Sequence, residues 1–168
     1  LALRDQSGKL FVIVTADLIG FRRVLSDVIA ERCLAKYGLP RDRLLLNASH
    51  VHSGPELSLG GGVTSPERIK RQQAAEKYTR ELLDRVVELV GKSIENLAPA
   101  RLEFGQGLAG FAVNRRRSRP NTRQFPGSVD HDVPVLAVRA PDGKLRAILF
   151  GYACHPTTNA AYFITADY

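Results

Sequence analysis

A strand, helix, strand pattern in the first 50 residues constrains the fold more than any other feature of this chain. Residues 10–16 read Leu-Phe-Val-Ile-Val-Thr-Ala, a continuous apolar run that is typical of a buried strand. Residues 44–49 predict a second strand. Between them, residues 22–37 predict a helix, with apolar side chains at helical spacing at Val24, Val28, Ile29 and Cys33. The short connections indicate a β-α-β unit with parallel strands.

The remainder of the chain predicts a long helix and three more strands. Ser65 as N-cap and Pro66 in the first turn begin a helix that extends to about residue 96. One strand alternates from residue 102, and strands over 133–139 and 145–152 are joined by a Pro-Asp-Gly turn. We therefore predict an α/β fold, a layered mixed β-sheet with flanking helices, in a single partial domain over residues 1–168. The apolar stripe of the long helix is expected at Tyr78, Leu82, Val86, Leu89 and Val90.

The composition suits a protein with a hydrophobic core. Hydrophobic residues make up 44% of the 168 residues, no apolar run approaches membrane-spanning length, and no signal peptide is visible. The chain starts at Leu1 rather than at methionine and stops at Tyr168 after an apolar stretch, so we expect a piece that is truncated at both ends. Cys33 is expected in the core. Cys154, on a predicted strand, is expected to point away from the side of His155.

Basic residues are concentrated between positions 115 and 123. The formal net charge is +7, and this segment holds Arg115, Arg116, Arg117, Arg119 and Arg123. One interpretation is a solvated loop, and the other is an anion site for phosphate, carboxylate or acidic lipid. No aromatic residues interleave with the arginines and no nucleic-acid motif accompanies them, so no nucleic-acid partner is expected.

Three of the four histidines lie in two segments that each follow a predicted strand. Residues 47–55 read Asn-Ala-Ser-His-Val-His-Ser-Gly-Pro, and residues 151–159 read Gly-Tyr-Ala-Cys-His-Pro-Thr-Thr-Asn. In an extended segment, His50 and His52 would point to the same side, so both could bind one metal ion, or one could bind while the other donates a proton. With His155 they would suit zinc. Hydrogen-bonded structural histidines at strand ends are the alternative interpretation.

Two metallohydrolase patterns fit these motifs only in part. The amidohydrolase superfamily also begins with His-x-His after a strand. The metallo-β-lactamase fold uses His-x-His-x-Asp-His, and here Ser53-Gly54-Pro55-Glu56 follows instead.

The order of motifs resembles the N-terminal catalytic domain of the neutral/alkaline (non-lysosomal) ceramidases over nearly the whole chain. The resemblance lies in a strand ending Ala-Asp, Ser-His-Val-His-Ser-Gly-Pro, Val-Asn-Arg, Val-Asp-His-Asp-Val-Pro-Val-Leu and Tyr-Ala-Cys-His-Pro-Thr.

The resemblance implies zinc-dependent hydrolysis of the amide bond of an N-acylsphingosine (ceramide) or a related N-acyl lipid. His50 and His155 match the zinc histidines of the family, and His52 matches the histidine beside the metal, with an acid/base or positioning role. Arg115 matches an arginine that lines the site, and Arg117 is a possible substitute. Further candidates for contact with substrate or with a ligand histidine are Asp17, Ser53, Asn159 and Asp167. Asp17 could instead cap the helix that follows it, and Asn159 could cap its own loop.

The family resemblance also implies partners and a location. It implies association with a membrane surface and a secreted, periplasmic or cell-surface protein. The remaining zinc ligands of the family, a glutamate and a tyrosine, and its catalytic serine lie downstream of the matching region, so residues 1–168 alone are expected to be inactive. Glu56-Leu57-Ser58 replaces the small residues of the family. Two alternatives therefore stay open: a metal hydrolase of a soluble amide or ester, and a non-catalytic homologue that binds acidic glycan or lipid through its basic loop.

Overall fold

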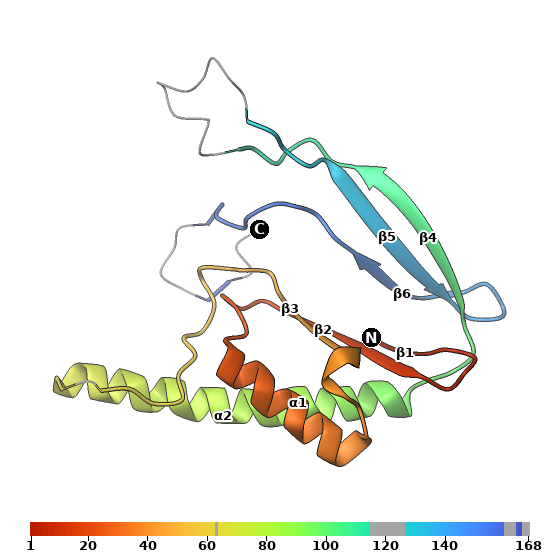
Figure 1. Cartoon of the computed structure of the whole chain (residues 1–168). Coiled ribbons are helices and arrows are strands. Elements are labelled where there is room, and N and C mark those ends of the chain that lie inside the picture. The colour runs from red at the N-terminus through yellow and green to blue at the C-terminus, as the bar shows by residue number, and fades with distance from the viewer. Residues whose placement is uncertain (63, 115–126, 160–163, 166–168) are drawn as a thin grey trace. The chain divides into compact units, whose positions relative to one another are not determined.

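The computed structural model describes residues 1–62, 64–114, 127–159 and 164–165 (Figure 1). The chain forms two compact units, one comprising Leu1–Leu97 and Pro156–Tyr168 and the other comprising Ala98–His155. Each unit contains a three-stranded sheet, and the helices belong to the first unit, so the predicted α/β fold class is confirmed. The single partial domain stays a prediction.

The sheet of the first unit contains the predicted β-α-β unit. Strand β1 (Ala2–Arg4) pairs antiparallel with β2 (Leu10–Ala16), and β2 pairs parallel with β3 (Leu44–Ala48). Helix α1 (Arg23–Tyr37) and the short 3-10 helix η1 (Arg41–Arg43) connect β2 to β3. The parallel pairing places the carboxyl ends of β2 and β3 at the same edge of the sheet, with Ala16 opposite Ala48.

Two helices cover one face of this sheet (Figure 1). Helix α2 (Pro66–Glu95) begins as predicted, because the hydroxyl of Ser65 accepts a hydrogen bond from the Arg68 amide at 3.4 Å. Helix α1 ends at Gly38, whose φ of 63° is most favourable for a residue without a side chain. Cys33 is fully buried, as predicted, and this burial raises the pKa of its thiol. The core between the helices and the sheet also contains Val12, Val14, Leu25, Ile29, Leu44, Leu83, Val86 and Val90.

The buried faces of both helices differ from the predicted stripes. On α1, Val24 is 61% exposed and its neighbour Leu25 is buried. On α2, Tyr78 and Leu89 are also exposed. On α1 the predicted stripe therefore chose the wrong one of two adjacent apolar residues, and on α2 it missed a packed face that includes small and polar residues. The buried residues of α2 are Ala75, Thr79, Leu83, Val86, Val87, Val90 and Gly91.

Gly91 of α2 lies against the side chain of Tyr37, the last residue of α1, and its replacement by alanine is expected to destabilise the protein. A Cβ atom at this position would lie 2.6 Å from Cζ of Tyr37. In an exposed helix the same change would stabilise by about 1 kcal/mol, but overpacking costs about 1–3 kcal/mol. We therefore expect a net loss of roughly 1 kcal/mol in a denaturant melt. The control is Gly91→Ala in a Tyr37→Leu background, where the change should stabilise. Stabilisation beside the native tyrosine would contradict the packing.

The second unit is an antiparallel sheet in the order β4 (Arg101–Leu108), β5 (Asp132–Arg139) and β6 (Leu145–Phe150). The predicted Pro-Asp-Gly turn joins β5 to β6, with Gly143 at φ 85°. Strand β6 ends at Phe150 and not at residue 152. Cys154 therefore lies outside any strand, so the argument that alternation turns it away from His155 was wrong.

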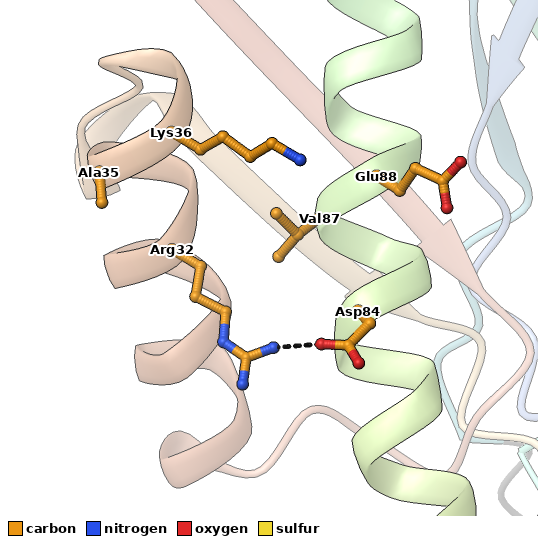
Figure 2. A pocket seen from close by; sticks show the side chains of 6 residues that line it. All are labelled: Arg32, Ala35, Lys36, Asp84, Val87 and Glu88. Carbon is orange, nitrogen blue, oxygen red and sulfur yellow. Dashed lines mark hydrogen bonds and ion pairs between the residues drawn. The ribbon is translucent and has the colours of Figure 1, made fainter.

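A shallow groove between α1 and α2 carries charges of opposite sign on its two sides (Figure 2). An Arg32 guanidinium nitrogen lies 2.6 Å from a carboxylate oxygen of Asp84. Because both side chains are largely exposed, this ion pair contributes little stability. The lining contains no histidine and consists of Arg32, Ala35, Lys36, Asp84, Val87 and Glu88. None of the helices in the described part of the chain is long and apolar enough to span a bilayer.

Candidate metal centre

The turn that follows β3 presents His50 and His52. The strand ends at Ala48, and His50 adopts a φ of 63°, in the left-handed region that residues with a side chain rarely occupy. The prediction that an extended backbone puts both histidines on one side was therefore wrong. The turn itself brings the rings together, with 5.1 Å between their centroids and an angle of 88° between their planes. Such backbone strain is found most often at functional sites.

The loop after β2 orients the His50 ring. Nδ1 of His50 lies 2.7 Å from the carbonyl oxygen of Ile19. Because a carbonyl can only accept, Nδ1 is the donor, and the neutral ring then has its lone pair on Nε2. A backbone carbonyl on the far nitrogen is the usual support of a metal-binding histidine. The adjacent ends of parallel strands β2 and β3 thus supply both the ring and its support.

Packing fixes the same turn from below. Val51, between the two histidines, is fully buried. A Cβ atom at Gly54 would lie 3.2 Å from Cγ1 of Val51 and 3.3 Å from the Asp17 carbonyl oxygen. Glycine therefore lets the chain pass close to the end of β2. Val51 fixes the turn to the core, and the two histidine rings lie outside the core.

Ser53 joins the histidine turn to the segment that follows His155. Its hydroxyl donates to the carbonyl oxygen of Asn159 at 3.3 Å, and its own carbonyl accepts a hydrogen bond from the Thr165 amide at 3.1 Å. Two of the predicted site residues, Ser53 and Asn159, are thus in direct contact. The contact uses the backbone of Asn159, and roles toward substrate remain predictions.

The approach to His155 is fixed within the second unit. The Gly151 amide donates to the Pro134 carbonyl at 3.1 Å. The Tyr152 hydroxyl donates to the Ala109 carbonyl at 2.8 Å and accepts from the Ala112 amide at 2.9 Å. His155 itself is the last residue of this unit and precedes Pro156, which is buried and belongs to the first unit.

His50, His52 and His155 form a group that could hold a metal ion. Each offers one ring nitrogen, and these atoms lie within 4.8 Å of one another. Around tetrahedral zinc with Zn–N bonds of about 2.0–2.1 Å, ligand nitrogens are about 3.3 Å apart, so modest side-chain movement would close the set. Three exposed imidazoles suit zinc and other nitrogen-preferring metals. The donor set therefore fits a metal without identifying it.

The structure treats the other predicted site residues unequally. Asp17 is exposed and directly follows β2, but α1 begins at Arg23 with Arg22 at the N-cap position. The alternative that Asp17 caps this helix was therefore wrong, and its role near the histidines remains a prediction. Arg115, its substitute Arg117 and Asp167 lie outside the described residues.

Two features of the turn were missed by the sequence interpretation. The Ile19 carbonyl that orients His50 belongs to the backbone, which leaves no signal in the sequence. The Ser49 hydroxyl is buried and has no hydrogen-bond partner within the described ranges. A buried unsatisfied hydroxyl costs about 1–3 kcal/mol.

Comparison with known proteins gives one consistent result. No family model matches the sequence. The neutral ceramidase of Pseudomonas aeruginosa is 29% identical over 174 residues, which cover 96% of this chain and 25% of that protein. A ceramidase complexed with C2 has 23% identity and a TM-score of 0.74, and a neutral ceramidase from Pseudomonas aeruginosa has 24% identity and a TM-score of 0.73; each covers 98% of this chain. The chain spans about a quarter of the length of these relatives.

Proposed function

We propose that this chain, which is similar to neutral ceramidases over nearly its whole length, forms part of a zinc-dependent hydrolase that cleaves the amide bond of an N-acylsphingosine or a related N-acyl lipid. The observation that carries this proposal is the grouping of His50, His52 and His155, whose potential ligand nitrogens lie within 4.8 Å of one another. They come from the same two motifs on which the resemblance rests.

In this proposal, His50 and His155 hold the metal, and residues beyond this chain complete its ligands. The chemistry that such an ion supplies is Lewis-acid polarisation of the amide carbonyl and a lowered pKa of the attacking water. The Ile19 carbonyl keeps the His50 ring in the tautomer that presents Nε2. The Ser53 contacts hold the segment after His155 against the turn that carries His50.

His52 is the proposed proton donor to the amine leaving group. Amide cleavage needs an acid close to the scissile nitrogen, and histidine titrates in the physiological range. Its ring lies edge-on to that of His50, with 5.1 Å between the centroids, so it is next to a proposed metal ligand. The same distances would allow His52 to act as a third ligand. Arg115 is proposed to bind a substrate oxygen through its guanidinium group.

A substrate panel with metal depletion tests the proposed function. The complete protein that contains this chain is expected to hydrolyse N-acylsphingosines in mixed micelles, to lose activity after treatment with a chelator, and to regain it with Zn²⁺. Soluble N-acyl amino acids and short esters are the matched comparison substrates. Chelator-resistant turnover, or the absence of a bound metal in the purified protein, would contradict the proposal.

A soluble amide or ester is the second candidate substrate. It is favoured by Glu56, which stands where the ceramidases have small residues and pairs with Arg71 at 2.6 Å. Glu56 stands four residues after His52, and a carboxylate at this position would suit a more polar substrate than ceramide. The substrate panel separates the two candidates, because only the second gives faster turnover of the soluble compounds. Binding of acidic lipid or glycan by the arginine-rich segment, a membrane-surface role and an extracytoplasmic location stay predictions.

A further inference from the structure

Residues 56–62, which follow the turn that carries His50 and His52, are attached to one face of α2. Leu57 is buried in the core, and the backbone N–H of Ser58 donates to the Thr79 hydroxyl at 2.9 Å. Further along, the Gln72 side-chain amide donates to the Gly61 carbonyl at 3.0 Å. This segment has no helix or strand of its own, so its position depends on such contacts.

Thr79 is the buried member of this set. Its side chain is fully buried on the packed face of α2. The hydroxyl donates to the Ala75 carbonyl at 2.7 Å, which leaves its lone pairs to accept from Ser58. A threonine in the middle of a helix gains little from helix propensity, and an apolar residue would suit this face equally well. The hydrogen bond from Ser58 is an interaction that only a residue with a hydroxyl could accept at this position.

The other contacts between this segment and α2 are weaker. The ion pair of Glu56 with Arg71 is short, 2.6 Å, but the side chains are 54% and 77% exposed, so it contributes little. Gln72 divides its amide between Gly61 and Glu76. Loss of the Thr79 hydroxyl would leave a backbone N–H without its partner in a part-buried place, which costs more than either exposed contact contributes.

We propose that Thr79 is a positioning residue for the metal-binding histidines and acts by anchoring the end of their turn on α2. The Ile19 carbonyl holds the His50 ring, and Thr79 holds Ser58. The buried Val51 and the Ser53 hydrogen bonds fix the residues between these two anchors. If the second anchor is lost, the segment populates detached conformations, and only the attached fraction binds metal at full affinity. This inference rests on the proposed metal site.

The test is a Co²⁺ titration of the complete protein, followed by its visible absorption, for three variants. Thr79→Val removes the hydroxyl at nearly constant volume and is expected to bind Co²⁺ about tenfold more weakly, with faster hydrogen exchange at the Ser58 amide. Thr79→Ser keeps the hydroxyl and should stay within about twofold of the native protein. Ser93→Ala is the matched control, because it removes a hydroxyl that donates only to the Val90 carbonyl of the same helix.

The outcomes separate this inference from the proposed function. Native affinity in Thr79→Val, or equal losses in Thr79→Val and Ser93→Ala, would overturn the positioning role. Absence of Co²⁺ binding by the native protein would instead overturn the metal site itself. If Thr79→Val fails to fold, hydrogen exchange in the native protein still decides, because an unprotected Ser58 amide is incompatible with the anchor.

Discussion

Replacing His50 by alanine is expected to abolish metal binding and hydrolysis in the complete protein. The change removes one of the nitrogens that lie within 4.8 Å of one another, together with the support from Ile19. On the proposed function, we expect the metal content to fall from one ion per chain to near zero, and kcat/KM to fall by roughly 10³-fold or more, because the ion would supply the main electrostatic stabilisation. His155→Ala should give the same result. Metal analysis and ceramide hydrolysis of the same preparations measure both quantities.

His131→Ala is the matched control for this prediction. His131 is the one histidine of the sequence that does not belong to the three-histidine group, and its side chain is exposed. Its replacement should leave metal content and activity within twofold. His52→Ala distinguishes the two roles that the geometry allows. Retained metal with lost turnover would indicate proton transfer, and loss of the metal would make His52 a ligand. A His50→Ala protein with full metal content would remove His50 from the site.

The fold could be predicted from the sequence where a pattern has one physical solution. Two strands that are joined by one helix and short connections are expected to pair in parallel. The chain has this order, with a helix ended by Gly38, and β2 and β3 do pair in parallel. The N-cap at Ser65 and the glycine turn at Gly143 were predicted for the same reason, since few residues suit these backbone conformations. Which face of a helix is buried depends on long-range packing, and the predicted faces of both helices were wrong in part.

The sequence motifs pointed to His50, His52 and His155 but not to their geometry, and the roles of these residues stay predictions. The motifs indicated His50, His52 and His155, and the structure groups them. The reasoning from an extended strand failed because β3 ends before the histidines and His50 turns into the left-handed region. No local pattern predicts such a strained residue, since long-range contacts around it stabilise it. For the same reason the sequence could not reveal the Ile19 carbonyl as the partner of His50.

Replacing Ile29 by alanine is expected to have the largest effect on the stability of the fold. Ile29 is 1% exposed and lies in the core that includes the sheet and both helices. Truncating a buried isoleucine to alanine costs about 2–5 kcal/mol, from lost burial and from the cavity that remains. Since domains of this kind are stable by about 5–15 kcal/mol, the variant should unfold at a clearly lower urea concentration. Ile29→Val should cost about 0.5–1.5 kcal/mol.

Val24→Ala on the same helix is the control that decides the orientation of α1. Val24 and Ile29 both belong to the apolar stripe predicted from the sequence. If that stripe were the buried face, truncating either side chain would destabilise the fold to a similar extent. In the structure Val24 is 61% exposed, so its replacement should change stability by no more than about 0.5 kcal/mol, with a small gain in helix propensity. Equal destabilisation by the two variants would indicate that α1 buries the face predicted from the sequence and not the face seen in the structure. Because α1 packs on the strands whose ends carry the Ile19 loop and the histidine turn, that orientation of α1 would also require a different support for His50.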